Sequence, residues 1–67
     1  MTKITIRAAR KNAGLTIVEA AKWLHIATST LSSYENGKTL PRLNILIAMC
    51  HLYGCDLGDL REGVYGK

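Results

Sequence analysis

The sequence predicts a small all-α fold, and three patterns carry this prediction. Thr16 and Glu19 stand three residues apart, which is the spacing of a capping box that begins a helix. The apolar residues after them recur every three to four positions, as they do on one face of an α-helix. Such periodic runs end at Gly37 and Gly54, where glycine supplies the left-handed conformation of a helix stop. Together, these patterns predict short helices joined by tight turns.

The first helix is predicted over residues 6–12. Thr5 fits its N-cap and Gly14 fits its stop. Arg7 is expected on its outer face. Its inner face should consist of small or branched apolar side chains, namely Ile6, Ala9 and Ala13.

The second predicted helix begins at the capping box and runs to about residue 24. Its inner face follows the spacing i, i+3, i+4, i+7 and comprises Ile17, Ala20, Ala21 and Leu24. Trp23 lies roughly 110° from the centre of that face, at about 100° per residue. It is interpreted either as an exposed anchor for a protein partner or, preferably, as a lid packed over the two alanines. His25 and Ile26 then break the periodicity and predict a turn.

The third predicted helix follows this turn, and Ala27, Leu31 and Tyr34 share its inner face. Its other side carries short polar side chains, which we call the polar band: Thr28, Ser29, Ser32, Ser33 and Asn36. A solvent-exposed helix of an all-α domain would explain this band. A helix inserted into the major groove of DNA would explain it equally well.

The stretch from Leu43 to Tyr53 is almost entirely apolar, which predicts a fourth helix. Its inward residues are assigned as Leu43, Leu46, Ile47, Met49, Cys50 and Tyr53. Ile45, Ala48 and Leu52 are then left outside the core, and an exposed apolar patch indicates an interface. We therefore predict that Ile45 and Leu52 form the contact of a weak homodimer.

Asp56 fits the N-cap of a short last helix, in which Leu57 and Leu60 close the core. Residues 61–67 are expected to form a loose tail, or one that orders only on dimerisation. Because the chain has only 67 residues, we expect residues 1–67 to form a single domain.

Composition narrows the class of protein. A hydrophobic content of 48% argues against disorder. No run of about 18 apolar residues is present, so a transmembrane helix is not expected. No basic and apolar signal sequence opens the chain, and the predicted location is therefore cytoplasmic.

The side chains that could carry chemistry do not form a convincing catalytic or metal site. Cys50 and Cys55 flank His51, but their spacing matches no common zinc pattern. Both cysteines are interpreted as small core residues, and a disulfide is not expected in a reducing cytosol. The two histidines, His25 and His51, lie outside the element that holds the hydroxyl cluster, so no nucleophile and base are paired. We expect no enzymatic activity, cofactor or metal.

Charge is distributed unevenly along the chain. Residues 1–42 contain seven basic and two acidic groups, a net charge of +5, whereas residues 43–67 have a net charge of −1. The positive part includes the polar band, as attraction to phosphates requires. RNA or an acidic membrane would also be attracted, so charge alone does not identify the partner.

Residues 6–60 resemble the Cro and phage-repressor (Xre) helix-turn-helix family. The matching positions are IRAARKNAGLT, Glu19, Ala21, STLSSYENGK, Pro41 and LYGCDLGDL. This resemblance implies a compact five-helix domain that binds operator DNA, usually as a dimer. It differs at His25, where the family prefers glycine, and at Ile17, where many members have a polar residue that contacts a phosphate.

The resemblance implies roles for particular residues. Base contacts are expected from Thr28, Ser29, Ser32 and Ser33, and phosphate contacts from Asn36, Lys38 and Arg42. Arg10 is expected to pair with Glu35, either partly buried or as an exposed pair of little energetic value. The function implied is that of a phage or mobile-element repressor that occupies an operator. The alternative is a protein-interaction module, such as an antitoxin or a partner of an antirepressor, that uses Trp23.

Overall fold

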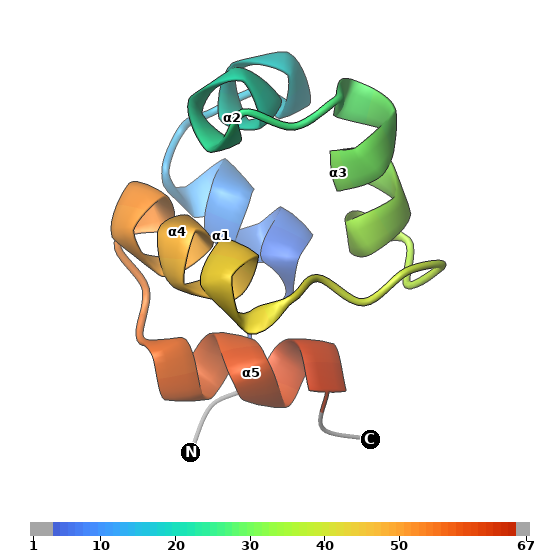
Figure 1. Ribbon diagram of the computed structural model, residues 1–67. Helices are drawn as coiled ribbons and strands as arrows, with labels where there is room; N and C mark the ends of the chain where they lie inside the picture. Colours follow the sequence, from blue (N-terminus) through green and yellow to red (C-terminus); the bar gives the residue numbers. More distant parts are fainter. Residues whose placement is uncertain (1–3, 66–67) are drawn as a thin grey trace.

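Five helices make up the part of the chain that the computed structural model describes, residues 4–65. They are α1 (Ile6–Asn12), α2 (Ile17–Leu24), α3 (Thr28–Glu35), α4 (Leu43–Tyr53) and α5 (Leu57–Tyr65). No strand occurs within these residues, and none of their helices is long and apolar enough to cross a membrane. Figure 1 shows α2 at one end of the molecule and α5 at the other, with α1 and α4 between them and α3 along one side. The all-α, five-helix prediction is confirmed.

Local hydrogen bonds begin the first two helices where the sequence predicts. The Ala8 amide donates to Thr5 Oγ1 over 3.1 Å at the start of α1. At the start of α2, the Glu19 amide donates to Thr16 Oγ1 (3.1 Å) and the Thr16 amide donates to Glu19 Oε1 (2.9 Å). The predicted capping box is therefore complete.

The turn between α2 and α3 depends on His25. Its φ of 58° makes it the one residue other than glycine with a left-handed backbone between residues 4 and 65. An L-residue in this conformation costs roughly 1–2 kcal/mol because Cβ crowds the following carbonyl oxygen. The amides of His25 and Ile26 nevertheless find partners, since they donate to the carbonyl oxygens of Lys22 (3.2 Å) and Ala21 (3.0 Å).

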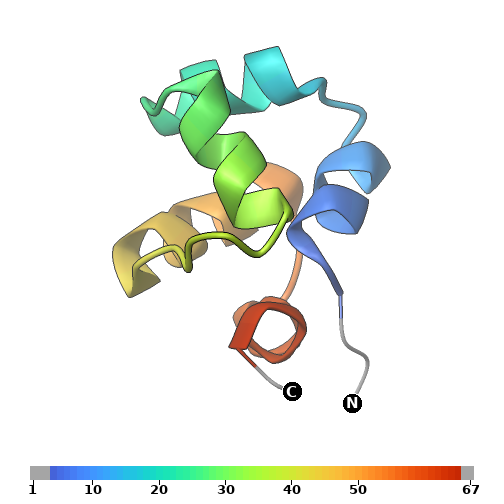
Figure 2. The same cartoon turned by 90° about the vertical axis from the view of Figure 1, so that its right-hand side faces the viewer.

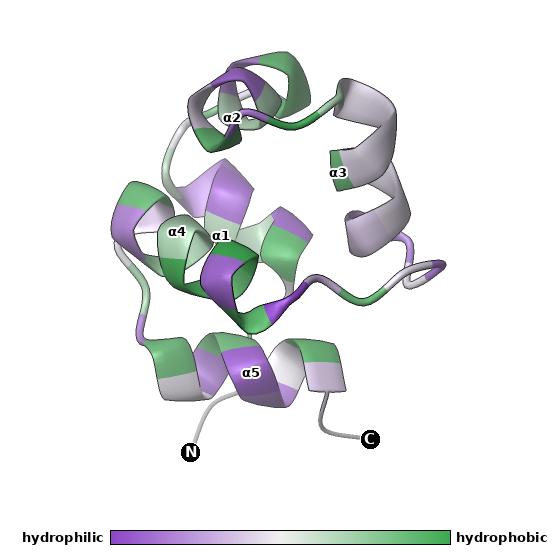
Figure 3. Cartoon of the chain, in the orientation of Figure 1, coloured by the Kyte–Doolittle hydropathy of each residue, from purple (hydrophilic) through white to green (hydrophobic). Residues whose placement is uncertain are grey.

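One apolar core joins all five helices. Its buried members are Ile6, Ala9, Ala20, Ala21, Leu24, Leu31, Leu46, Met49, Tyr53 and Leu60. Leu31, Leu46 and Leu60 are fully buried and come from α3, α4 and α5. In Figure 3, α4 is mostly green with a few purple segments, whereas α3 is pale apart from one green segment. Leu31 is the one fully buried residue of α3, and most of the surface of this helix therefore lies outside the core.

The structure corrects the predicted inner faces at several positions. Ala13 is exposed because the chain already turns away from α1 at Gly14. On α4, Leu43 and Ile47 are exposed, although they were assigned inward. The residues expected to remain outside, Ile45, Ala48 and Leu52, are instead half-buried against the core. A nearly uniform apolar helix has no polar side to mark its outer face, and the buried stripe follows Leu46, Met49 and Tyr53.

The prediction of a loose tail is wrong for residues 61–65, which continue α5. Val64 packs against the core, and the Tyr65 hydroxyl donates a hydrogen bond to the Pro41 carbonyl oxygen. Gly63 lies so close to the first described residue that a Cβ atom there would be 1.9 Å from the Ile4 carbonyl oxygen. These long-range contacts hold α5 in place within one chain. The rest of the predicted tail, residues 66 and 67, lies outside the described residues.

Candidate nucleic-acid interface

The polar band lies on α3, which packs against α2 and crosses the front of the molecule in Figure 2. Thr28 and Ser29, at the beginning of α3, are exposed. Ser32 and Ser33 are half-buried, so the band is most accessible at the N-terminal end of the helix. Short side chains would allow another surface to approach the α3 backbone closely.

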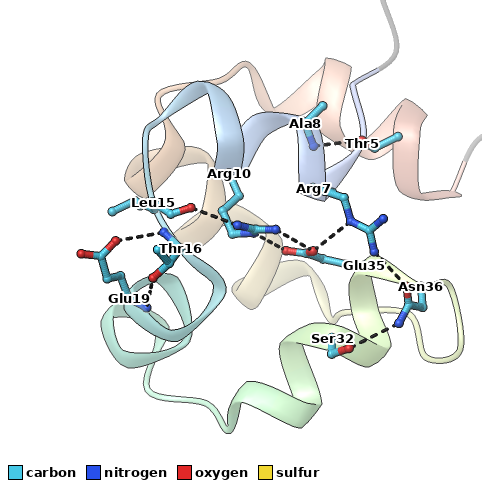
Figure 4. A network of polar contacts seen from close by, with 10 residues as sticks. All are labelled: Thr5, Arg7, Ala8, Arg10, Leu15, Thr16, Glu19, Ser32, Glu35 and Asn36. Carbon is cyan, nitrogen blue, oxygen red and sulfur yellow. Dashed lines mark hydrogen bonds and ion pairs between the residues drawn. The ribbon is translucent and has the colours of Figure 1, made fainter.

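A partly buried ion pair connects α1 to the end of α3 (Figure 4). Arg10 Nε donates to Glu35 Oε2 over 2.7 Å, and Arg10 Nη2 donates to Glu35 Oε1 over 3.2 Å. The side chains are only 11% and 2% exposed, respectively, so the partly buried alternative is the correct one. Arg10 Nη1 also donates to the Leu15 carbonyl oxygen over 3.0 Å. The hydrogen bond to Glu35 raises the pKa of Arg10 and keeps its charge fixed.

Arg7 extends this network in a way that sequence reasoning missed. Its Nε lies 3.4 Å from Glu35 Oε1, and its Nη2 donates to Asn36 Oδ1 over 3.0 Å. Asn36 Nδ2 in turn donates to Ser32 Oγ over 3.3 Å. The signal was the spacing of Arg7 and Arg10, because residues i and i+3 share a helix face. The network places Asn36 and Ser32, two members of the polar band, in fixed positions.

The Tyr53 hydroxyl is buried and has no hydrogen-bond partner among residues 4–65. Burial, reinforced by the negative charge of Glu35, raises the pKa of Tyr53 to about 12. This hydroxyl therefore stays neutral near the ion pair and adds no charge to the interior.

The backbone of the loop between α3 and α4 is held by hydrogen bonds, and the loop carries two long cationic side chains. The amides of Lys38 and Thr39 donate to the Ser33 carbonyl oxygen over 3.0 and 3.4 Å, and Pro41 is buried. Lys38 and Arg42 are exposed, and neither forms an ion pair with another residue of the described range. Lys38 follows the C-terminal end of α3 and Arg42 is the N-cap residue of α4, so both charges are available in the segment that joins these helices.

Trp23 is 68% exposed, which contradicts its preferred interpretation as a lid over α2. Ala20 and Ala21 are already buried by the other helices and leave no apolar surface for the indole to cover. The indole instead lines an open surface hollow of about 340 Å³ together with Lys22 and His25.

Comparison with known protein families matches residues 4–63 to a helix-turn-helix domain. The chain belongs to the helix-turn-helix domain family. The match includes α1 to α4 and all but the end of α5. No curated protein and no solved structure matches the chain significantly. Within the helix-turn-helix domain, α2 and α3 are the consecutive helices and His25 lies in the turn between them. In DNA-binding motifs of this kind, the second helix enters the major groove.

Proposed function

We propose that this helix-turn-helix protein is a sequence-specific DNA-binding transcriptional regulator of the Cro or phage-repressor (Xre) type. It acts in the cytoplasm by occupying an operator and excluding polymerase. One observation carries the proposal: the exposed start of α3 lies in the same matched domain, residues 4–63, as two exposed cations that follow this helix, Lys38 and Arg42. A groove-reading helix flanked by phosphate-binding groups is the arrangement that operator recognition requires.

Base edges are read by Thr28, Ser29, Ser32 and Ser33. Thr28 and Ser29 reach the bases first, because they are exposed at the N-terminal end of α3. Hydroxyl groups distinguish bases less sharply than the bidentate pairs made by Arg, Asn or Gln. Specificity therefore depends partly on thymine methyl contacts and on the shape of the groove.

Phosphates are bound by Asn36, Lys38 and Arg42. The hydrogen bonds from the loop amides to the Ser33 carbonyl oxygen keep Lys38 next to α3. Contacts with the DNA backbone set the register of the protein without reading sequence. Affinity then comes mainly from charge, and binding is expected to weaken steeply as salt is added.

A salt titration of gel retardation, with DNA that flanks the gene, tests the function. Lys38→Ala and Arg42→Ala should each weaken binding to all sequences about equally and lower the salt slope by about one unit. Arg61→Ala, at an exposed position of α5, is the matched loss of charge outside the interface and should leave the slope unchanged. A changed sequence preference with an unchanged slope would contradict the assignment of Lys38 and Arg42.

A second candidate function is supported by the exposure of Trp23. A tryptophan that is 68% exposed is a typical anchor for a protein partner. On this alternative the chain is a protein-interaction module, for example an antitoxin or a partner of an antirepressor. The same titration separates the two functions, since a module of this kind would not retard the flanking DNA at any salt concentration.

A further inference from the structure

The chain turns between α4 and α5, at the left of Figure 1, and the last turn of α4 contains Cys50 while Cys55 lies in the turn that follows. Gly54 has a φ of 71°, and the amides of Gly54 and Cys55 both donate to the Cys50 carbonyl oxygen, over 2.9 and 3.3 Å. These two hydrogen bonds to one carbonyl oxygen fold residue 55 back over the last turn of α4. In helix ends of this type, the side chains at these two positions commonly touch.

The two thiols are free, half-buried and part of the apolar surroundings of the core. Burial, together with the neighbouring Cys55, raises the pKa of Cys50 to about 11. Among residues 4–65, no group of three or more His, Cys, Asp or Glu side chains is placed to hold a metal ion. The chemistry available to this pair is therefore that of two adjacent thiols.

We propose that Cys50 and Cys55 are a redox pair that closes reversibly into a disulfide by exchange with a low-molecular-weight disulfide such as oxidised glutathione. The Cys55 thiolate attacks one sulfur of oxidised glutathione, and the first glutathione leaves as a thiolate. The Cys50 thiol then loses its proton to water and attacks the Cys55 sulfur, which releases the second glutathione. Two protein thiols are oxidised, and one glutathione disulfide is reduced to two thiols.

The order of the two steps follows from the surroundings of the thiols. The thiolate is the attacking species, and the raised pKa of Cys50 leaves little thiolate there near neutral pH. Cys50 therefore acts second, when Cys55 already carries the leaving group beside it. The resulting link ties the end of α4 to the segment that begins α5, and it should raise the melting temperature because it restrains the unfolded chain.

The test is intact-mass spectrometry of the full chain equilibrated with mixtures of reduced and oxidised glutathione. The wild type should lose the mass of two hydrogens and retain no glutathione. Cys50→Ser should instead hold one glutathione on Cys55, because no second thiol is present to displace it. Stable glutathione adducts on the wild type, or disulfide-linked dimers as the main product, would overturn the proposal.

A second measurement needs no variant and separates folded geometry from sequence proximity. The equilibrium constant for closing the disulfide should be about tenfold or more higher in buffer than in concentrated urea, because the fold holds the sulfurs adjacent. Equal constants in the two solvents would mean that the corner does not present the thiols to each other, and the proposal would fail. Circular dichroism before and after oxidation checks that the helices remain intact.

Discussion

Glu35 is the residue on which the polar contacts between α1 and α3 converge. Its carboxylate is 2% exposed and lies within reach of two guanidinium groups. A buried carboxylate without partners destabilises the folded state. The pair therefore matters for stability mainly because removal of one partner leaves the charge of the other uncompensated. Arg7 is 51% exposed, and solvent screens its share of the interaction.

We predict that Glu35→Ala lowers the free energy of unfolding by about 3–5 kcal/mol, because it leaves the mostly buried Arg10 guanidinium without a counter-charge. Arg10→Ala should cost less, because Arg7 Nε, 3.4 Å from Glu35 Oε1, still pairs with the carboxylate. The double variant should lose less than the sum of the two single losses. Arg7→Ala, which removes only the exposed partner, should cost under about 1 kcal/mol. Urea denaturation of the wild type and the four variants gives these values, and strict additivity of the Arg10 and Glu35 changes would show that the pair does not interact.

His25 is a second residue whose effect on the stability of the fold can be predicted, in this case from its backbone conformation. Its left-handed conformation is one that glycine adopts without crowding, so His25→Gly should stabilise the fold by about 1 kcal/mol. His25→Ala keeps a Cβ atom and should bring no such gain. Thermal unfolding of both variants distinguishes relief of backbone strain from simple removal of the imidazole, and an equal gain in both would contradict the backbone explanation.

At the scale of a single element, α3 has the clearest expected behaviour. If its polar band approaches base edges closely, Ser29→Gln or Ser33→Gln should clash with the cognate operator and change sequence preference. Asn12→Gln lengthens an exposed polar residue on α1 and serves as the matched control. Footprinting on a library of operator variants measures the outcome. Unchanged affinity and an unchanged footprint for both serine variants would place α3 outside the groove.

Some helices could be predicted from the sequence more accurately than others. Helix ends defined by contacts between neighbouring residues were predictable, whereas those defined by contacts between distant residues were not. The start of α2 depends on Thr16 and Glu19 alone, and the N-cap of α1 at Thr5 and the stop of α4 at Gly54 are likewise local signals that the structure contains. The length of α5 depends on contacts with Pro41 and Ile4, which are distant in the sequence. No local sequence pattern predicts these contacts.

The candidate interface shows the same limit. The Arg10 and Glu35 pair was predictable through resemblance to a family, whereas the role of Arg7 required the relative position of two helices. The exposure of Trp23 was misjudged because a periodicity gives the angle of a side chain around one helix, but not what the other helices already cover.

For the molecule as a whole, the proposed function calls for two copies on one operator. Two copies related by a two-fold axis, with their recognition helices about 34–36 Å apart, could read successive major-groove faces of a palindrome. We propose Ile45 and Leu52 as the apolar contact, although their half-burial leaves only part of each side chain available to a second copy. Such a contact is small, so the dimer should be weak in solution and tighten on the operator.

We predict that Ile45→Asp or Leu52→Asp abolishes cooperative operator binding, visible as a change from one-step to two-step gel retardation. Circular dichroism must show an intact fold, since both side chains also touch the core. Leu43→Asp and Ile47→Asp, at exposed positions of the same helix, are the matched controls and should keep cooperativity. Loss of cooperativity in the controls alone would move the interface to the opposite side of α4.

The position of α5 in the chain has a consequence for synthesis. The core needs Leu60 from α5, and α5 in turn holds Ile4 and Pro41. While a ribosome is still making the chain, α1 and α4 emerge before α5, the helix against which both of them pack. The growing chain therefore exposes apolar surface of α1 and α4 until α5 has emerged, and on the proposed function only molecules that have completed this helix can occupy an operator.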